Sequence, residues 1–99
     1  MTESFDELGP DEDRLDGAWL DTPEGVSSDA IDRRIFWLVR RSLRPCAMAH
    51  GGWEQLFVDP RDGRYWELTF PLGSLHGGGP RRLTCLSPAD ARAKYSLKD

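Results

Sequence analysis

The chain has 99 residues, of which 38% are hydrophobic and 30% are charged, and its formal net charge is −4. This length suits one small domain with a modest core. No apolar run approaches the roughly 18 residues of a membrane-spanning helix, and the first residues lack the features of a secretory signal. The composition therefore predicts a cytoplasmic protein with no membrane partner. Cys46 and Cys85 show no metal-ligand spacing, so we expect reduced thiols and no metal site.

The charge is divided unevenly along the chain. Residues 1–32 carry eleven Asp or Glu and one Arg, whereas residues 33–99 carry twelve Lys or Arg and six acids. Either the acidic part is a solubilising segment that lies on the basic body, or one charged surface meets a partner of opposite sign. Because residues 1–14 have few apolar side chains, they are predicted to form a weakly ordered acidic segment ahead of a single domain at 15–99.

The first predicted elements are a short strand, a turn and a long helix. Residues 15–20 favour a strand, and residues 21–25 are typical of a turn. Residues 30–43 favour a helix that stops before Pro45, because a proline disfavours helical backbone in the residue before it. Serine and aspartate at 27–29 supply candidates for its N-cap.

Trp37 departs from the pattern of this helix. Ile31, Ile35 and Leu38 fall on one apolar stripe, while Trp37 lies on the opposite, arginine-rich side. Two interpretations stay open. Trp37 packs beneath the N-terminal segment or a loop, or it belongs to an exposed Trp–Arg patch of the kind enriched in binding hot spots.

A β-hairpin is the strongest structural prediction. Large and polar residues alternate at 53–58 and again at 65–70. Between them, Asp59 and Pro60 suit the first two positions of a type I turn, and Gly63 suits the left-handed position that closes the loop.

The remaining residues complete the predicted fold. Residues 46–50 fit either a strand or a linker, and residues 82–86 favour a strand. Ser87 and Pro88 open a short helix that ends near Tyr95. The order β-α-β-β-β-α predicts an α+β fold with a small antiparallel sheet of about four strands, the long helix packed on one face, and a short C-terminal helix.

The charged residues of the hairpin favour structural roles. Glu54 and Glu67 lie on the predicted strands, where each needs a cationic partner such as Arg64 or Arg34 to offset the cost of burial. The net negative charge and the lack of a recognisable binding module argue against a nucleic-acid partner.

The glycine loop at 76–80 is the stretch that suggests a small-molecule site. Three glycines follow His76, and their amides could form an anion nest ahead of Arg81 and Arg82. An enzymatic interpretation needs a nucleophile motif, a Walker lysine pattern or a metal cluster, and the sequence contains none of them. We therefore predict no enzyme activity, no catalytic residue and no cofactor. A phosphate- or nucleotide-binding module or small enzyme that uses the His76 loop stays as the alternative.

Several motifs together resemble the immunity protein twenty-seven family of bacterial antidotes, which are encoded beside polymorphic toxins. The motifs are Trp19 in G-x-W, Arg34-Ile35, Trp53-Glu54 before a D-P-x-D-G-R turn, Trp66-Glu67-Leu68 with Pro71, and H-G-G-G-P at 76–80 followed by Leu83. The resemblance spans about residues 15–95. It implies a non-enzymatic binding protein, a monomer or weak dimer, whose partner is a cognate toxin from a neighbouring gene.

The resemblance and the charge pattern together suggest which residues touch the toxin. If the toxin is a nuclease with a basic substrate groove, clustered acids would imitate phosphates and steer association. A second hypothesis places the interface on the glycine loop and the Trp37 side of the helix. The candidate contact residues are Asp11, Glu12, Asp13, Asp16, Trp37, Asp59, Asp62 and His76.

Overall fold

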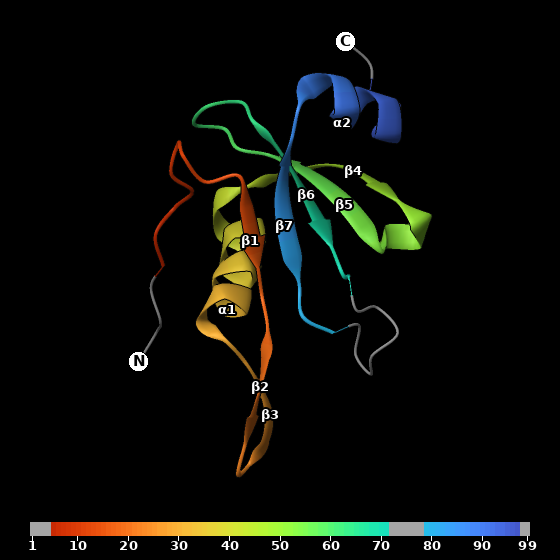
Figure 1. Cartoon of the computed structure of the whole chain (residues 1–99). Helices are drawn as coiled ribbons and strands as arrows, with labels where there is room; N and C mark the ends of the chain where they lie inside the picture. Colours follow the sequence, from red (N-terminus) through yellow and green to blue (C-terminus); the bar gives the residue numbers. More distant parts are fainter. Residues whose placement is uncertain (1–4, 72–78, 98–99) are drawn as a thin grey trace.

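The computed structural model describes residues 5–71 and 79–97 (Figure 1). Their elements form a five-stranded antiparallel sheet in the order β1-β7-β6-β5-β4, a separate two-stranded sheet β2-β3, and two α-helices. The predicted α+β class is confirmed, with more strands than the expected four. The bounds are β1 Arg14–Asp16, β2 Trp19–Thr22, β3 Gly25–Ser28, α1 Ala30–Trp37, β4 Arg44–Ala49, β5 Glu54–Val58, β6 Tyr65–Thr69, β7 Arg82–Leu86 and α2 Pro88–Tyr95.

The predicted hairpin is present as β5 and β6. Its loop closes where Gly63 donates a backbone hydrogen bond of 2.7 Å to the carbonyl of Asp59. Gly63 has a φ of 78°, the left-handed conformation that the sequence predicts. β7 and α2 also occur where predicted, and the Ser87 hydroxyl caps α2 by accepting from the amide of Asp90.

The long helix begins as predicted and changes its geometry before its expected end. The side chain of Asp29 caps α1 by accepting from the amide of Asp32 at 2.7 Å. The α-helix ends at Trp37, and Leu38–Ser42 continue as a π-helical turn in which the Leu43 amide donates to the carbonyl of Leu38 at 2.8 Å. This wider turn places both leucines in the core. The expectation of one α-helix over 30–43 is therefore wrong in its last turn.

The strand expected at 15–20 is two strands, because the chain leaves the large sheet between them. At Gly17 the backbone amide donates to the carbonyl of Arg81 at 2.8 Å. A Cβ atom at this position would lie 2.8 Å from Asp32 and 2.9 Å from that carbonyl, so only glycine fits. The chain then forms β2, turns at Pro23 and Glu24, and returns as β3, which the sequence had indicated as part of a turn.

The helices cover the two faces of the large sheet unequally. One face buries Trp66 and Leu83 against Ile35 and Leu38 of α1 and its π-helical extension, in the main core. On the other face, a smaller cluster joins Leu56 to Ala91 and Tyr95, with α2 at one end of the sheet (Figure 1). Neither helix covers the rest of that second face, and the described residues there line a hollow. Within the described residues, no helix is both long and apolar enough to cross a membrane.

Candidate functional site

Residues 5–13, called the strap here, run along the body of the domain and turn once, where the Glu12 amide donates to the Gly9 carbonyl at 3.1 Å. Its Leu8 is buried in the main core, and the ring of its Phe5 lies 6.1 Å from the ring of Trp37. Trp37 is half-buried beneath the strap, so the packing interpretation of this residue is confirmed. Ile35 and Leu38 are buried as predicted, whereas Ile31 on the same stripe stays exposed.

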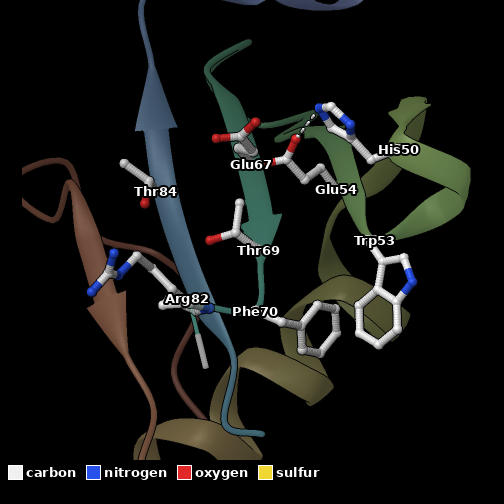
Figure 2. Close-up of a pocket in the computed structure, with 9 residues that line it drawn as sticks. His50, Trp53, Glu54, Glu67, Thr69, Phe70, Arg82 and Thr84 are labelled. Atoms are coloured by element: carbon white, nitrogen blue, oxygen red, sulfur yellow. Dashed lines mark ion pairs between the residues drawn. The ribbon is translucent and has the colours of Figure 1, made fainter. Parts of the chain in front are cut away.

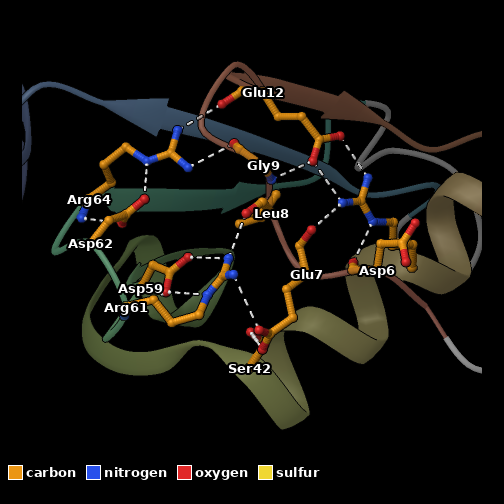
Figure 3. Close-up of polar contacts among 11 residues, drawn as sticks. Asp6, Glu7, Leu8, Gly9, Glu12, Ser42, Asp59, Arg61, Asp62 and Arg64 are labelled. Atoms are coloured by element: carbon orange, nitrogen blue, oxygen red, sulfur yellow. Dashed lines mark hydrogen bonds and ion pairs between the residues drawn. The ribbon is translucent and has the colours of Figure 1, made fainter.

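Three arginines hold the strap through its backbone carbonyls (Figure 3). Arg34 donates to the carbonyls of Asp6 and Glu7 at 2.9 and 3.0 Å. Arg61 donates to the carbonyl of Leu8 at 2.5 Å. Arg64 donates to the carbonyls of Gly9 and Glu12 at 3.0 and 2.8 Å. Because all three arginines lie 27 or more residues from their partners, these bonds join the strap to the middle of the sequence rather than to neighbouring residues.

The side chain of Glu12 also bonds to one of these arginines. Its two carboxylate oxygens accept from the Arg34 guanidinium at 2.7 and 2.8 Å. That hydrogen bond is the main reason that the pKa of Glu12 falls to about 2, far below its ordinary value. Glu12 is therefore charged and paired at neutral pH.

Three other predicted contact residues are also paired within the chain. Asp59 is fully buried and bonds to Arg61, and Asp62 bonds to Arg64 at 2.7 Å. Asp16, on β1, accepts from Arg82 at 2.5 Å and from Arg14 at 2.8 Å. The hydrogen bond from Arg82 lowers the pKa of Asp16, and a backbone hydrogen bond from Arg64 lowers that of Asp62.

The predicted contact residues are thus partly brought together. Glu12, Asp59 and Asp62 lie close to the three arginines that bond to the strap, whereas Asp16 lies on the open face of the large sheet. Asp11 and Asp13 are exposed on the strap, and their carboxylates have no partner among the described residues. His76 falls outside the described residues.

The open part of the second sheet face forms a hollow of about 570 Å³, called the sheet-face hollow here (Figure 2). It lies beside α2 over the middle strands, and neither helix fills it. Its lining residues are His50, Trp53, Glu54, Glu67, Thr69, Phe70, Pro71, Arg82 and Thr84.

Two acids at one end of this hollow form a fixed ion cluster. Glu67 is nearly buried, with Lys94 at 2.6 Å and the Tyr95 hydroxyl donating to it at 2.7 Å. Lys94 also lies 3.0 Å from Glu54, which His50 approaches at 3.0 Å. Burial, followed by the hydrogen bond to Glu67, raises the pKa of Tyr95.

Glu54 and Glu67 form salt bridges as predicted, but the predicted partners are wrong. Lys94 of α2 takes the place expected for Arg64 or Arg34, because those two arginines hold the strap. With both carboxylates paired to Lys94, the cluster fastens α2 to the sheet. Its geometry suits a rigid binding surface rather than proton transfer.

At the other end, the hollow carries an aromatic pair of which Trp53 is exposed and Phe70 is half-buried against the main core. Trp53 is 54% exposed and meets Phe70 edge-on, with ring centroids 5.7 Å apart and an interplanar angle of 88°. The turn before it has three successive residues with positive φ, namely His50, Gly51 and Gly52 at 54°, 66° and 95°. Glycine takes this conformation at little cost, but a histidine in it is strained.

Reasoning from the sequence missed this aromatic pair. It assigned Trp53 and Phe70 to the ends of the hairpin strands and could not tell which face each ring would occupy. The two glycines ahead of Trp53 are the available signal, since they indicate a tight turn that directs the following side chain. Within the described part of the chain, no group of three or more His, Cys, Asp or Glu side chains could hold a metal ion.

Comparison with known proteins gives one match. No curated protein and no solved structure matched the chain. The family model described as immunity protein 27 matches residues 21–87, which is more than half of the chain. The match takes in α1 and the strands from β3 to β7, while the strap, β1 and α2 lie outside it. This extent of agreement shows that the chain belongs to the immunity protein 27 family.

Proposed function

We propose that this chain binds a cognate bacterial toxin and neutralises it by covering or distorting the toxin's active site in a stoichiometric complex. The match to the immunity protein 27 family over residues 21–87 is the observation that carries this proposal. The toxin is expected to be of the polymorphic class, encoded by a neighbouring gene and met in the cytoplasm. The chain acts in this proposal by binding alone, without catalysis or a cofactor.

The rigidity of the domain supports such a role. The strap, the sheet and α2 are cross-linked by Arg34, Arg61, Arg64 and Lys94, so the surface is formed before a partner arrives. A preformed surface loses little conformational entropy on binding, and this raises affinity without new contacts.

The electrostatic part of the proposal rests on Asp11 and Asp13. Among the predicted contact acids, these two keep charges that no described residue neutralises, whereas Glu12, Asp16, Asp59 and Asp62 are paired inside the chain. Unpaired carboxylates would attract the basic substrate groove of a nuclease and accelerate association. Trp37 supports this surface from beneath, because its ring packs against Phe5 of the strap.

Co-expression with the toxin domain of the neighbouring gene tests the function. Cells that carry both proteins should grow, and cells that carry the toxin alone should not. Purified Asp11→Asn/Asp13→Asn protein should associate several-fold more slowly at low ionic strength, with a smaller difference at about 0.15 M salt. Asp90→Asn, which removes an exposed acid of α2, is the control.

Two outcomes separate the parts of the proposal. Failure of the wild-type chain to protect cells would contradict the toxin-binding function itself. Protection with an unchanged association rate in the double variant would contradict only the steering role of Asp11 and Asp13.

A further inference from the structure

The two-stranded sheet and its flanks, residues 17–29, form a projecting element called the arm here (Figure 1). Among the described strands, β2 and β3 pair only with each other, in a register from Trp19 opposite Ser28 to Thr22 opposite Gly25. The Thr22 hydroxyl closes the tip by donating to the Gly25 carbonyl at 2.6 Å. At the base, the Asp29 amide donates to the Ala18 carbonyl at 2.9 Å. The arm is therefore an ordered hairpin that projects from the body.

The register divides the arm into two faces. Trp19, Asp21 and Val26 share one face, because Asp21 lies opposite Val26 and Trp19 is two residues from Asp21. Leu20 belongs to the other face. Val26 and Leu20 are 61% and 51% exposed, so each face presents one apolar side chain to solvent. Leu20 can therefore serve as a control for Val26, because both are exposed apolar residues on opposite faces of the arm.

The face that carries Val26 borders a hollow of about 420 Å³, called the arm groove here. Trp19 and Val26 line it from the arm, and Phe70 and Arg81 line it from the body. Phe70 also lines the sheet-face hollow, where it meets Trp53. The arm groove and the sheet-face hollow are thus neighbours that share one aromatic ring.

The charges of the arm specify the chemistry of a partner. Residues 17–29 contain three acids and no Lys or Arg. Asp29 caps α1, whereas the carboxylates of Asp21 and Glu24 have no partner among the described residues. Arg81, at the inner wall, is already bonded to Asp32 at 2.9 Å. The arm therefore presents unneutralised negative charge beside exposed apolar surface.

We propose that the arm groove binds a segment of the toxin in which an apolar side chain adjoins a Lys or Arg. The apolar side chain lies between Trp19, Val26 and Phe70, and the cation pairs with Asp21 at the outer end. This assignment rests on the proposed toxin-binding function. An apolar anchor surrounded by complementary charge is the arrangement that concentrates binding energy at protein interfaces.

Two matched double variants of the full chain test the assignment. Val26→Ala/Asp21→Asn removes the apolar side chain and the acid of the groove face. Leu20→Ala/Asp90→Asn removes an apolar side chain from the other face of the arm and an acid from α2, so the net charge changes equally. Affinity for the catalytic domain of the neighbouring gene's toxin is measured by calorimetry, and thermal unfolding confirms that both variants fold.

We expect the groove variant to bind at least about tenfold more weakly and the control to stay within about twofold of wild type. Asp21→Lys alone, which leaves the apolar surface intact, should also weaken binding about tenfold or more. If the wild-type chain binds the toxin and the groove variants bind equally well, the groove assignment is overturned while the toxin-binding function stands. A wild-type chain that does not bind overturns both.

Sedimentation of the chain without toxin tests the competing occupant. We expect no dimer that depends on Val26. A dimer that the Val26→Ala/Asp21→Asn variant abolishes would assign the groove to a second copy of the chain and overturn the toxin proposal for this surface.

Discussion

Asp32 shows how a single acid of the negatively charged third of the chain becomes a structural residue. It is fully buried and accepts from the backbone amide of Arg81 at 2.8 Å and from its guanidinium at 2.9 Å. The guanidinium of Arg81 also lies 4.9 Å from the ring centroid of Phe36. Buried ion pairs of this kind fix a position more than they add stability, and removing one partner leaves an uncompensated charge. Here the pair fixes the start of β7 against α1.

Gly17 fits against this pair, and its replacement should be costly. We predict that Gly17→Ala lowers the free energy of unfolding by about 1–3 kcal/mol, because the added Cβ would overlap Asp32 and a backbone carbonyl that cannot move independently. Urea denaturation measures the change. Gly9→Ala is the control, since its nearest neighbour would lie 3.7 Å away. Equal stability of the two variants would contradict the close approach at Gly17.

Glu12 should make the stability of the strap depend on pH. The Arg34 hydrogen bond lowers the pKa of Glu12 from 4.5 to about 2, so its contribution is present above pH 4.5 and is lost as the pH falls toward 2. Because the pair is partly exposed, Glu12→Gln should cost only about 1 kcal/mol at pH 7. Denaturant unfolding from pH 7 to 3 should show wild type and variant converging. A constant difference over that range would contradict the pairing.

At the scale of elements, local signals predicted part of the fold well. The hairpin of β5 and β6 follows from alternation and from the turn residues Asp59 and Gly63, and α2 follows from its Ser87 cap. β3 was missed because residues 25–28 contain a glycine, two serines and a single apolar residue, Val26, so they lack the alternation of a half-buried strand. The π-helical turn was missed because its determinant is the packing of Leu38 and Leu43 in the core.

The candidate site was less predictable than the elements. Which acids are paired depends on Arg34, Arg61 and Arg64, and contacts so distant in sequence leave no local pattern. The pairing of Trp53 with Phe70 also goes beyond the alternation pattern, because both rings lie just outside the paired strands β5 and β6. Residue types alone indicated an acidic surface. They did not indicate that a large part of its negative charge is paired with arginines of the same chain.

The strap gives the clearest test at this scale, because its sequence predicts weak order. Leu8 is buried in the main core, so Leu8→Ala should lower the free energy of unfolding by about 2–5 kcal/mol if the strap stays clamped. Leu20→Ala, at an exposed leucine of the arm, should change it by no more than about 0.5 kcal/mol. A Leu8→Ala variant as stable as wild type would support a weakly ordered strap. Urea denaturation of both variants distinguishes a strap that is packed in the core from a weakly ordered one.

At the scale of the whole molecule, the division of charge has a structural meaning. The acidic first third lies on the basic remainder and is joined to it by the pairs of Glu12 with Arg34, Asp16 with Arg82, and Asp32 with Arg81. Among the acids that no described residue neutralises, Asp11 and Asp13 lie on the strap, and Asp21 and Glu24 lie on the arm. Negative potential at these places would select a basic partner. Both of the predictions for toxin contact follow from this distribution.

Titration of the toxin's activity with the purified full-length chain tests the central claim most directly. We expect the activity to fall in proportion to the added chain and to end when the two proteins are equimolar, as in tight one-to-one occlusion. Toxin activity that persists in the presence of excess folded chain would contradict it.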